Sequence, residues 1–173
     1  MGKTRYIGVS NFTQQHLTQL LTHAKIKPAV NQVEFHPFLF SQELLEYCTQ
    51  QEIQLQAYSS LGAGSKELIE HPVVIEIAQH YPIKQTNHKH EEEFKQQGND
   101  QANNREQAHK TPAQILLRWA LQHGVGVIPK TIHESWIIEN SLLFDFEINE
   151  EDMKKLDALH CNKRFCWDPT KVV

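Results

Sequence analysis

The sequence predicts an α/β fold built on parallel strands, and three observations lead to this class. Runs with strand character alternate with stretches whose apolar residues recur at helical spacing. Each strand-like run ends in polar residues, as is typical where the carboxyl ends of parallel strands meet a ligand. Only four such runs are present, and eight are needed to close a barrel. Two arrangements therefore fit: an open doubly wound sheet, or part of a (β/α) barrel.

The four predicted strands cover residues 5–9, 29–35, 53–58 and 126–131. The first is expected to be short and buried. The second contains Asn31 and Gln32, whose amides would be costly in a core strand unless they are paired. The fourth, Gly126–Thr131, passes through Pro129 to Lys130 and so places a cation at the end of a strand.

Capping residues locate the helices between these strands. Thr13 and Ser41 are good N-caps for helices that run to about Ala24 and Gln51. Pro72 and Pro112 suit the first turn of two further helices. The predicted helices cover about residues 13–24, 43–51, 73–81, 111–123, 133–142 and 149–159.

One polar stretch, residues 82–109, interrupts this pattern. Ile83 and Phe94 are its only large apolar residues, so it cannot bury enough surface to offset the entropy of ordering. We predict a flexible insertion, with a transient helix near residues 91–97, inside a single domain of residues 1–173. Four histidines in or beside it raise a metal site as an alternative, but their irregular spacing favours a solvated loop: His80, His88, His90 and His109.

Composition excludes several classes of function. A net charge of -4 offers no footprint for nucleic acid or an anionic membrane. No apolar run approaches the ~20 residues that span a bilayer, and the first residues lack the apolar core of a signal peptide. The cysteines are Cys48, Cys161 and Cys166. Cys161 and Cys166 could pair, but the odd number favours free thiols in a reducing, cytoplasmic setting.

Six sequence blocks, in this order and spacing, resemble the C-terminal half of an aldo-keto reductase. They are Ile7–Phe12, Pro28–Pro37, Ala57–Gly62, Thr111–Trp119, Val127–Asn140 and Phe144–Phe146. That family folds as an eight-stranded barrel and transfers hydride between NADPH and a carbonyl compound. The resemblance implies a partial (β/α)8 TIM barrel, made of the last four strand-helix units, with NADP as cofactor.

The resemblance also implies which residues contact the cofactor, and their chemistry suits the task. An amide group needs donors and acceptors, a flat ring needs an aromatic face, and a phosphate needs a cation and hydroxyls. The implied contacts are Ser10, Asn11 and Gln32 with the nicotinamide carboxamide; Tyr58 with the nicotinamide ring; Ser59, Leu61 and Gly62 with the pyrophosphate; Lys130 and Thr131 with the 2′-phosphate; and Glu139 and Asn140 with adenine.

Two departures from the family pattern shape the expected function. The family's catalytic Asp, Tyr, Lys and His lie in the first half of the barrel, and His36 is not that histidine. Trp136 stands where the family usually has the Arg that grips the 2′-phosphate, which weakens the expected affinity for NADPH.

The predicted function is that of an NADP-dependent aldo-keto reductase which reduces aldehydes and ketones to alcohols but is inactive alone. Hydride transfer needs a proton donor for the developing alkoxide, and none is assigned here. A small carbonyl substrate is expected only if the barrel is completed. The alternative is a non-catalytic nucleotide-binding or interaction module, such as a truncated isoform or an auxiliary subunit. The open edges of a half barrel further predict self-association.

Overall fold

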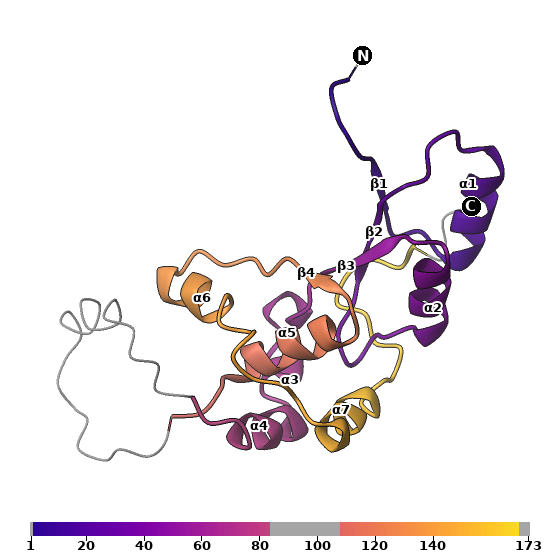
Figure 1. Ribbon diagram of the computed structural model, residues 1–173. Helices are drawn as coiled ribbons and strands as arrows, with labels where there is room; N and C mark the ends of the chain where they lie inside the picture. The colour runs from indigo at the N-terminus through magenta and orange to yellow at the C-terminus, as the bar shows by residue number, and fades with distance from the viewer. Residues whose placement is uncertain (1, 84–107, 170–173) are drawn as a thin grey trace.

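A parallel sheet lies at the centre of the computed structural model, which describes residues 2–83 and 108–169 (Figure 1). Its spatial order, β1-β2-β3-β4, equals the order along the chain. The strands are β1 Gly8–Ser10, β2 Val30–Glu34, β3 Gln54–Tyr58 and β4 Gly126–Val127. A doubly wound sheet reverses its strand order at a switch point. The described strands contain no such reversal.

The helices follow the predicted caps closely. They are α1 Gln14–His23, α2 Gln42–Gln50, α3 Lys66–Ile69, α4 Pro72–Gln79, α5 Pro112–Gln122, α6 Glu134–Glu139 and α7 Glu150–Asp157. Thr13 and Thr111 each form a complete capping box, with His16 and Gln114 as the reciprocal partners. Within the described ranges, none of the helices has the length and apolar character needed to cross a membrane.

The segment after β3, where the sequence predicted no strand or helix before residue 73, contains two short helical elements. It contains the 3-10 turn η1, Gly62–Gly64, followed directly by α3. Ser65 separates the two and its extended backbone allows α3 to start. This short stretch brings Leu68 into the core, where its side chain is fully buried.

The first and last strands differ from the sequence prediction. The strand expected at residues 5–9 forms at Gly8–Ser10, and its predicted burial is wrong because Tyr6 and Ile7 are 78% and 47% exposed. Only β2 pairs with this strand, so one edge of it has no cover among the described residues. The strand expected at 126–131 ends at Val127, since Pro129 carries no N–H to continue the ladder.

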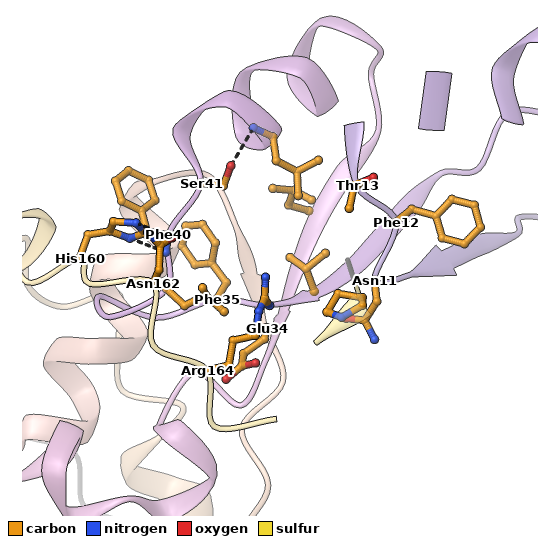
Figure 2. A pocket seen from close by; sticks show the side chains of 15 residues that line it. Asn11, Phe12, Thr13, Glu34, Phe35, Phe40, Ser41, His160, Asn162 and Arg164 are labelled. Atoms are coloured by element: carbon orange, nitrogen blue, oxygen red, sulfur yellow. Dashed lines mark hydrogen bonds between the residues drawn. The ribbon is translucent and has the colours of Figure 1, made fainter. Parts of the chain in front are cut away.

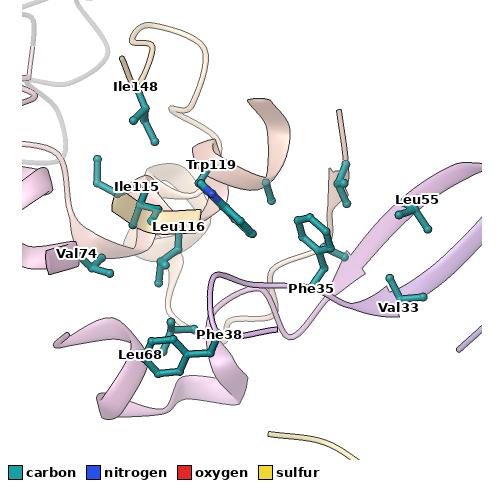
Figure 3. Close-up of a cluster of buried hydrophobic side chains, with 14 of the residues drawn as sticks. Val33, Phe35, Phe38, Leu55, Leu68, Val74, Ile115, Leu116, Trp119 and Ile148 are labelled. Atoms are coloured by element: carbon teal, nitrogen blue, oxygen red, sulfur yellow. The ribbon is translucent and has the colours of Figure 1, made fainter. Parts of the chain in front are cut away.

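Alternation along the strands gives the sheet an apolar face and a polar face. The apolar face packs on the helices, where Trp119 of α5 stacks on Phe35 with ring centroids 5.1 Å apart (Figure 3). The polar face carries Gln32 and Gln56 side by side, with Gln32 Nε2 donating to Gln56 Oε1 at 2.8 Å. A polar sheet face of this kind is the one available to a ligand.

Most of the predicted insertion, residues 84–107, lies outside the described residues. Its two ends lie together: Ile83 N donates to Ala108 O and Lys110 N donates to Tyr81 O, each at 2.8 Å. The chain therefore leaves and re-enters the fold at one place between α4 and α5.

Candidate functional site

The carboxyl ends of β1, β2 and β3 meet at one edge of the sheet. Sharp turns follow two of them, with positive φ at Asn11 (60°) and Ser59 (51°). Left-handed backbone is uncommon for serine and costs conformational energy, and such residues often occur at binding sites. These turns direct the polar side chains that follow each strand toward one another.

Four of the predicted nicotinamide contacts are brought together at this edge. Ser10 Oγ donates to Gln32 O at 3.0 Å, and Tyr58 Oη donates to Asn11 Oδ1 at 3.0 Å. Burial, followed by the nearby Cys166 and Glu34, raises the pKa of Tyr58, so its phenol stays neutral and can act as a donor. The structure thus joins residues from three strands into one cluster.

The cluster suits a carboxamide ligand. Within residues 2–83 and 108–169, Asn11 Nδ2 and Gln32 Oε1 have no hydrogen-bond partner, which leaves one donor and one acceptor for a ligand. A primary amide offers the complementary acceptor and donor. The hydroxyl of Tyr58 contacts Asn11, and the half-buried ring offers a face for stacking. These features fit the nicotinamide end of a dinucleotide.

The predicted phosphate and adenine residues form a second group at the exit of β4. Lys130, Thr131 and Asn140 line an open pocket of about 290 Å³ together with Pro129, Ile137 and Ser141. Thr131 Oγ1 accepts from His133 N at 3.1 Å, while Lys130 is exposed. Glu139 is not part of this lining; its backbone oxygen accepts from Gln114 Nε2 at 3.1 Å.

The predicted pyrophosphate residues have packing roles in this structure. Leu61 packs against the core, and Gly62 is buried with φ 59°. A Cβ at Gly62 would lie 2.9 Å from Cε2 of Phe165, so only glycine fits under that ring. Ser59 contacts Cys166 instead, with Oγ and Sγ 3.3 Å apart.

Asn31 has a structural role, unlike its neighbour Gln32. It is fully buried, and its Nδ2 donates to Phe12 O at 2.8 Å while its Oδ1 accepts from Phe12 N at 3.3 Å. The amide therefore fixes the turn between β1 and α1. This pairing explains how a strand in the core carries an asparagine.

A buried Glu34–His36 pair was not predicted from the sequence as part of the site. His36 Nε2 and Glu34 Oε1 are 3.1 Å apart, and both side chains are almost completely buried. Burial lowers the pKa of His36, although the hydrogen bond with Glu34 opposes the shift. Glu34 Oε1 also accepts from Phe165 N at 2.6 Å. No local sequence signal could reveal the contact between Glu34 and Phe165, because these two residues are 131 positions apart.

The predicted metal alternative finds no support in the described residues. No group of three or more potential ligands gathers anywhere in those ranges. His80 pairs with Asp152, with Nδ1 and Oδ2 3.0 Å apart, and His109 bridges to Pro82 at the base of the insertion. His88 and His90 lie outside the described residues.

Comparison with known proteins identifies the family. A model of the aldo/keto reductase family matches residues 1–160. The chain belongs to the aldo/keto reductase family. It is 45% identical over 172 residues to a glyoxal reductase of Bacillus subtilis, covering 99% of this chain and 52% of that protein. The family resemblance inferred from the six sequence blocks is therefore confirmed.

Solved structures of this family share the fold. An aldo-keto reductase from a Medee basin deep-sea metagenome library superposes with TM-score 0.79 at 34% identity, covering 99% of this chain and 55% of that one. An NADPH complex of a silkworm (Bombyx mori) aldo-keto reductase gives TM-score 0.74 at 27% identity, covering 96% and 45%. The chain thus spans about half the length of the relatives it matches.

Proposed function

We propose that this chain forms the cofactor-binding half of an NADPH-dependent aldo-keto reductase that reduces aldehydes or ketones to alcohols. Its four strand-helix units would be the last four of a (β/α)8 barrel, and the sequential order of the parallel sheet supports that assignment. The observation that carries the proposal is the convergence of Ser10, Asn11, Gln32 and Tyr58 at the carboxyl edge of this sheet.

The residues of the chain would bind and orient the dinucleotide. Asn11 and Gln32 would hold the carboxamide, and the ring of Tyr58 would support one face of the nicotinamide. Lys130 and Thr131 would receive the phosphate end at the pocket beyond β4. NADPH, when bound, supplies the hydride for the carbonyl carbon.

Proton delivery must come from outside the chain in this proposal. A carbonyl that accepts hydride also needs a proton on its oxygen. Tyr58 is a poor source because burial raises the pKa of its phenol, and its hydroxyl already donates to Asn11. We therefore expect no carbonyl reduction by these residues alone. The second candidate, a non-catalytic nucleotide-binding module, is favoured by the same observation.

Discrimination between NADPH and NADH is expected to be weak. Lys130 is the only cation that lines the pocket beyond β4 among the described residues. Trp136 lies on α6, and its ring centroid is 4.3 Å from that of His133. Its indole can stack on a ligand but cannot neutralise a phosphate. Lys130 would then provide most of the preference for the phosphorylated cofactor.

Titration with each nucleotide, followed by quenching of tryptophan fluorescence, tests the proposal. We expect both nucleotides to bind. Tyr58→Ala should weaken the affinity for both by about tenfold, whereas Tyr58→Phe should retain the affinity because stacking persists. Lys130→Met should weaken the affinity for NADPH by about fivefold and leave the affinity for NADH unchanged. Absence of binding, or an unchanged affinity in Tyr58→Ala, would refute the site. A turnover assay with glyoxal should show no reduction by the chain alone, and measurable turnover would contradict the expectation that the proton comes from outside it.

The cellular setting and association state belong to the same proposal. Cys48, Cys161 and Cys166 are all free thiols in the structure, which supports a reducing, cytoplasmic environment. Strands β1 and β4 each have one unpaired edge among the described strands, which supports self-association of the isolated chain.

A further inference from the structure

Glu34 joins the end of β2 to a distant part of the chain. The 161–169 segment follows α7 and returns toward the sheet (Figure 1). Glu34 Oε1 accepts hydrogen bonds from the backbone N–H groups of Phe165 at 2.6 Å and Cys166 at 3.3 Å. Glu34 is only 6% exposed, so these hydrogen bonds form away from solvent. One buried oxygen therefore fixes the backbone of the segment.

Packing around Phe165 reinforces this attachment. Its ring lies 5.1 Å from that of His36, centroid to centroid, and fills the space above Gly62. Figure 2 shows Glu34 and Arg164 among the residues around a pocket of about 230 Å³, whose lining combines β2 with the 161–169 segment. The segment thus lies directly against the strand ends.

The attachment places two side chains of the segment at the candidate cofactor site. Cys166 Sγ lies 3.3 Å from Oγ of Ser59. Trp167 lines a hollow of about 480 Å³ together with Ser10 and Asn11. The surroundings of one predicted pyrophosphate residue and of two predicted carboxamide residues therefore depend on where the segment is held.

The hydrogen bonding of the pair is incomplete inside the protein. Glu34 Oε2 and His36 Nδ1 are buried and have no partner among the described residues. Unsatisfied buried groups are costly and are usually removed where stability is the only demand. Their presence beside the cofactor residues favours a role in the site over a purely structural one.

We propose that Glu34 is a positioning residue that anchors the 161–169 segment across the strand ends, so that Cys166 and Trp167 form one wall of the cofactor site. The identity of the ligand rests on the proposed function, whereas the anchoring rests on the contacts of Glu34 alone. A glutamate side chain suits this role because one carboxyl oxygen can accept hydrogen bonds from two backbone amides.

The reactivity of Cys166 measures the anchoring directly. In a Cys161→Ser background Cys166 is the accessible thiol, because Cys48 is 1% exposed. We expect Glu34→Ala to raise the rate of Cys166 alkylation by iodoacetamide about tenfold, since the two hydrogen bonds that hold the backbone of the segment are lost. Glu34→Gln keeps an acceptor oxygen of the same shape and should give a smaller increase.

A second buried carboxylate provides the matched control. Asp152 is 2% exposed and bonds to His80 and Tyr81 rather than to the 161–169 segment, so Asp152→Asn should leave the alkylation rate within about twofold. Equal rates in wild type and both folded Glu34 variants would overturn the proposal, as would an equal increase in Asp152→Asn. If Glu34→Ala does not fold, Glu34→Gln decides: a faster rate supports anchoring and an unchanged rate refutes it.

Added NADPH separates this inference from the proposed function. In the Cys161→Ser protein with Glu34 intact, nucleotide bound beside Ser59 should slow the alkylation of Cys166. Release of the segment in Glu34→Ala without any protection by NADPH would support the anchor and refute the cofactor site. Protection of Cys166 by NADPH, with no effect of either Glu34 variant on the alkylation rate, would support the cofactor site and refute the anchor.

Discussion

At the scale of single residues, buried carboxylates connect elements that are distant in sequence. Asp152 of α7 accepts hydrogen bonds from His80 at 3.0 Å and from Tyr81 at 2.8 Å. Burial raises the pKa of Asp152, but these hydrogen bonds outweigh it and hold the pKa below the ordinary value. Burial is also the main reason that the pKa of Tyr81 rises to about 12. The carboxylate is thus ionised and the phenol neutral at physiological pH.

Replacing Asp152 by Ala should destabilise the fold by about 1–3 kcal/mol, because His80 and Tyr81, which follow α4, lose their acceptor. The free energy of unfolding in urea measures this loss. Glu150 lies in the first turn of the same helix with a 95% exposed side chain, and Glu150→Ala should change stability by less than about 0.5 kcal/mol. Equal effects of the two substitutions would contradict the assignment.

His36 should make stability fall as the pH falls below about 6.5. Its pKa is lowered by burial, so between the folded and unfolded values the unfolded chain binds the extra proton. The contribution is complete above 6.5 and declines by at most about 1.4 kcal/mol per pH unit below it. Urea unfolding at pH 7.5 and 5.5 measures the slope.

The variant His36→Asn should have a shallower slope than wild type over this range. The same substitution at His23, which is exposed at the end of α1, should leave the wild-type slope in place. An unchanged slope in His36→Asn would show that other groups cause the pH dependence.

The sequence allowed the polar strand ends to be predicted but not the contacts that support them. Gln32 and Tyr58 stand out because polar and aromatic groups end otherwise strand-like runs. Glu34 has the same position, yet its partner Phe165 is 131 residues away, and only tertiary folding brings the two together. Long-range backbone contacts of this kind have no periodic signature.

At the scale of helices and strands, local hydrogen-bonding rules account for the accurate predictions. Thr13 and Thr111 cap helices in the structure as their spacing indicated, because each satisfies an N–H that the helix leaves unpaired. The edge strands were less predictable, since a strand needs a neighbour and β1 has only β2. Its exposure depends on what packs beside it rather than on its apolar residues.

Thr13→Ala should therefore destabilise the protein by about 1 kcal/mol. Thr13 Oγ1 accepts from His16 N at 3.3 Å, and that N–H would lose its partner. Thr22 lies within the same helix and bonds only to Gln19 O, so Thr22→Ala should be neutral or slightly stabilising. Thermal or urea unfolding of both variants measures the difference, and equal losses would contradict a capping role.

At the scale of the whole molecule, helices cover the apolar face of the sheet, whereas the outer edges of β1 and β4 are unpaired among the described strands. Next to these edges, Ile7 is 47% and Ile128 43% exposed. Unpaired strand edges with apolar flanks are templates for pairing with another chain. The polar sheet face that carries the predicted cofactor residues lies between the same two edges.

We therefore expect the purified chain to self-associate, with a sedimenting mass above 20.1 kDa that rises with protein concentration in the micromolar range. Ile7→Lys should reduce this association, because a charge beside an edge strand opposes pairing. Ile75→Lys is the matched control, since Ile75 is 39% exposed but lies on α4, away from the edges. A monomer at every concentration, with one sharp melting transition, would show instead that the four-stranded sheet is stable with its edges open.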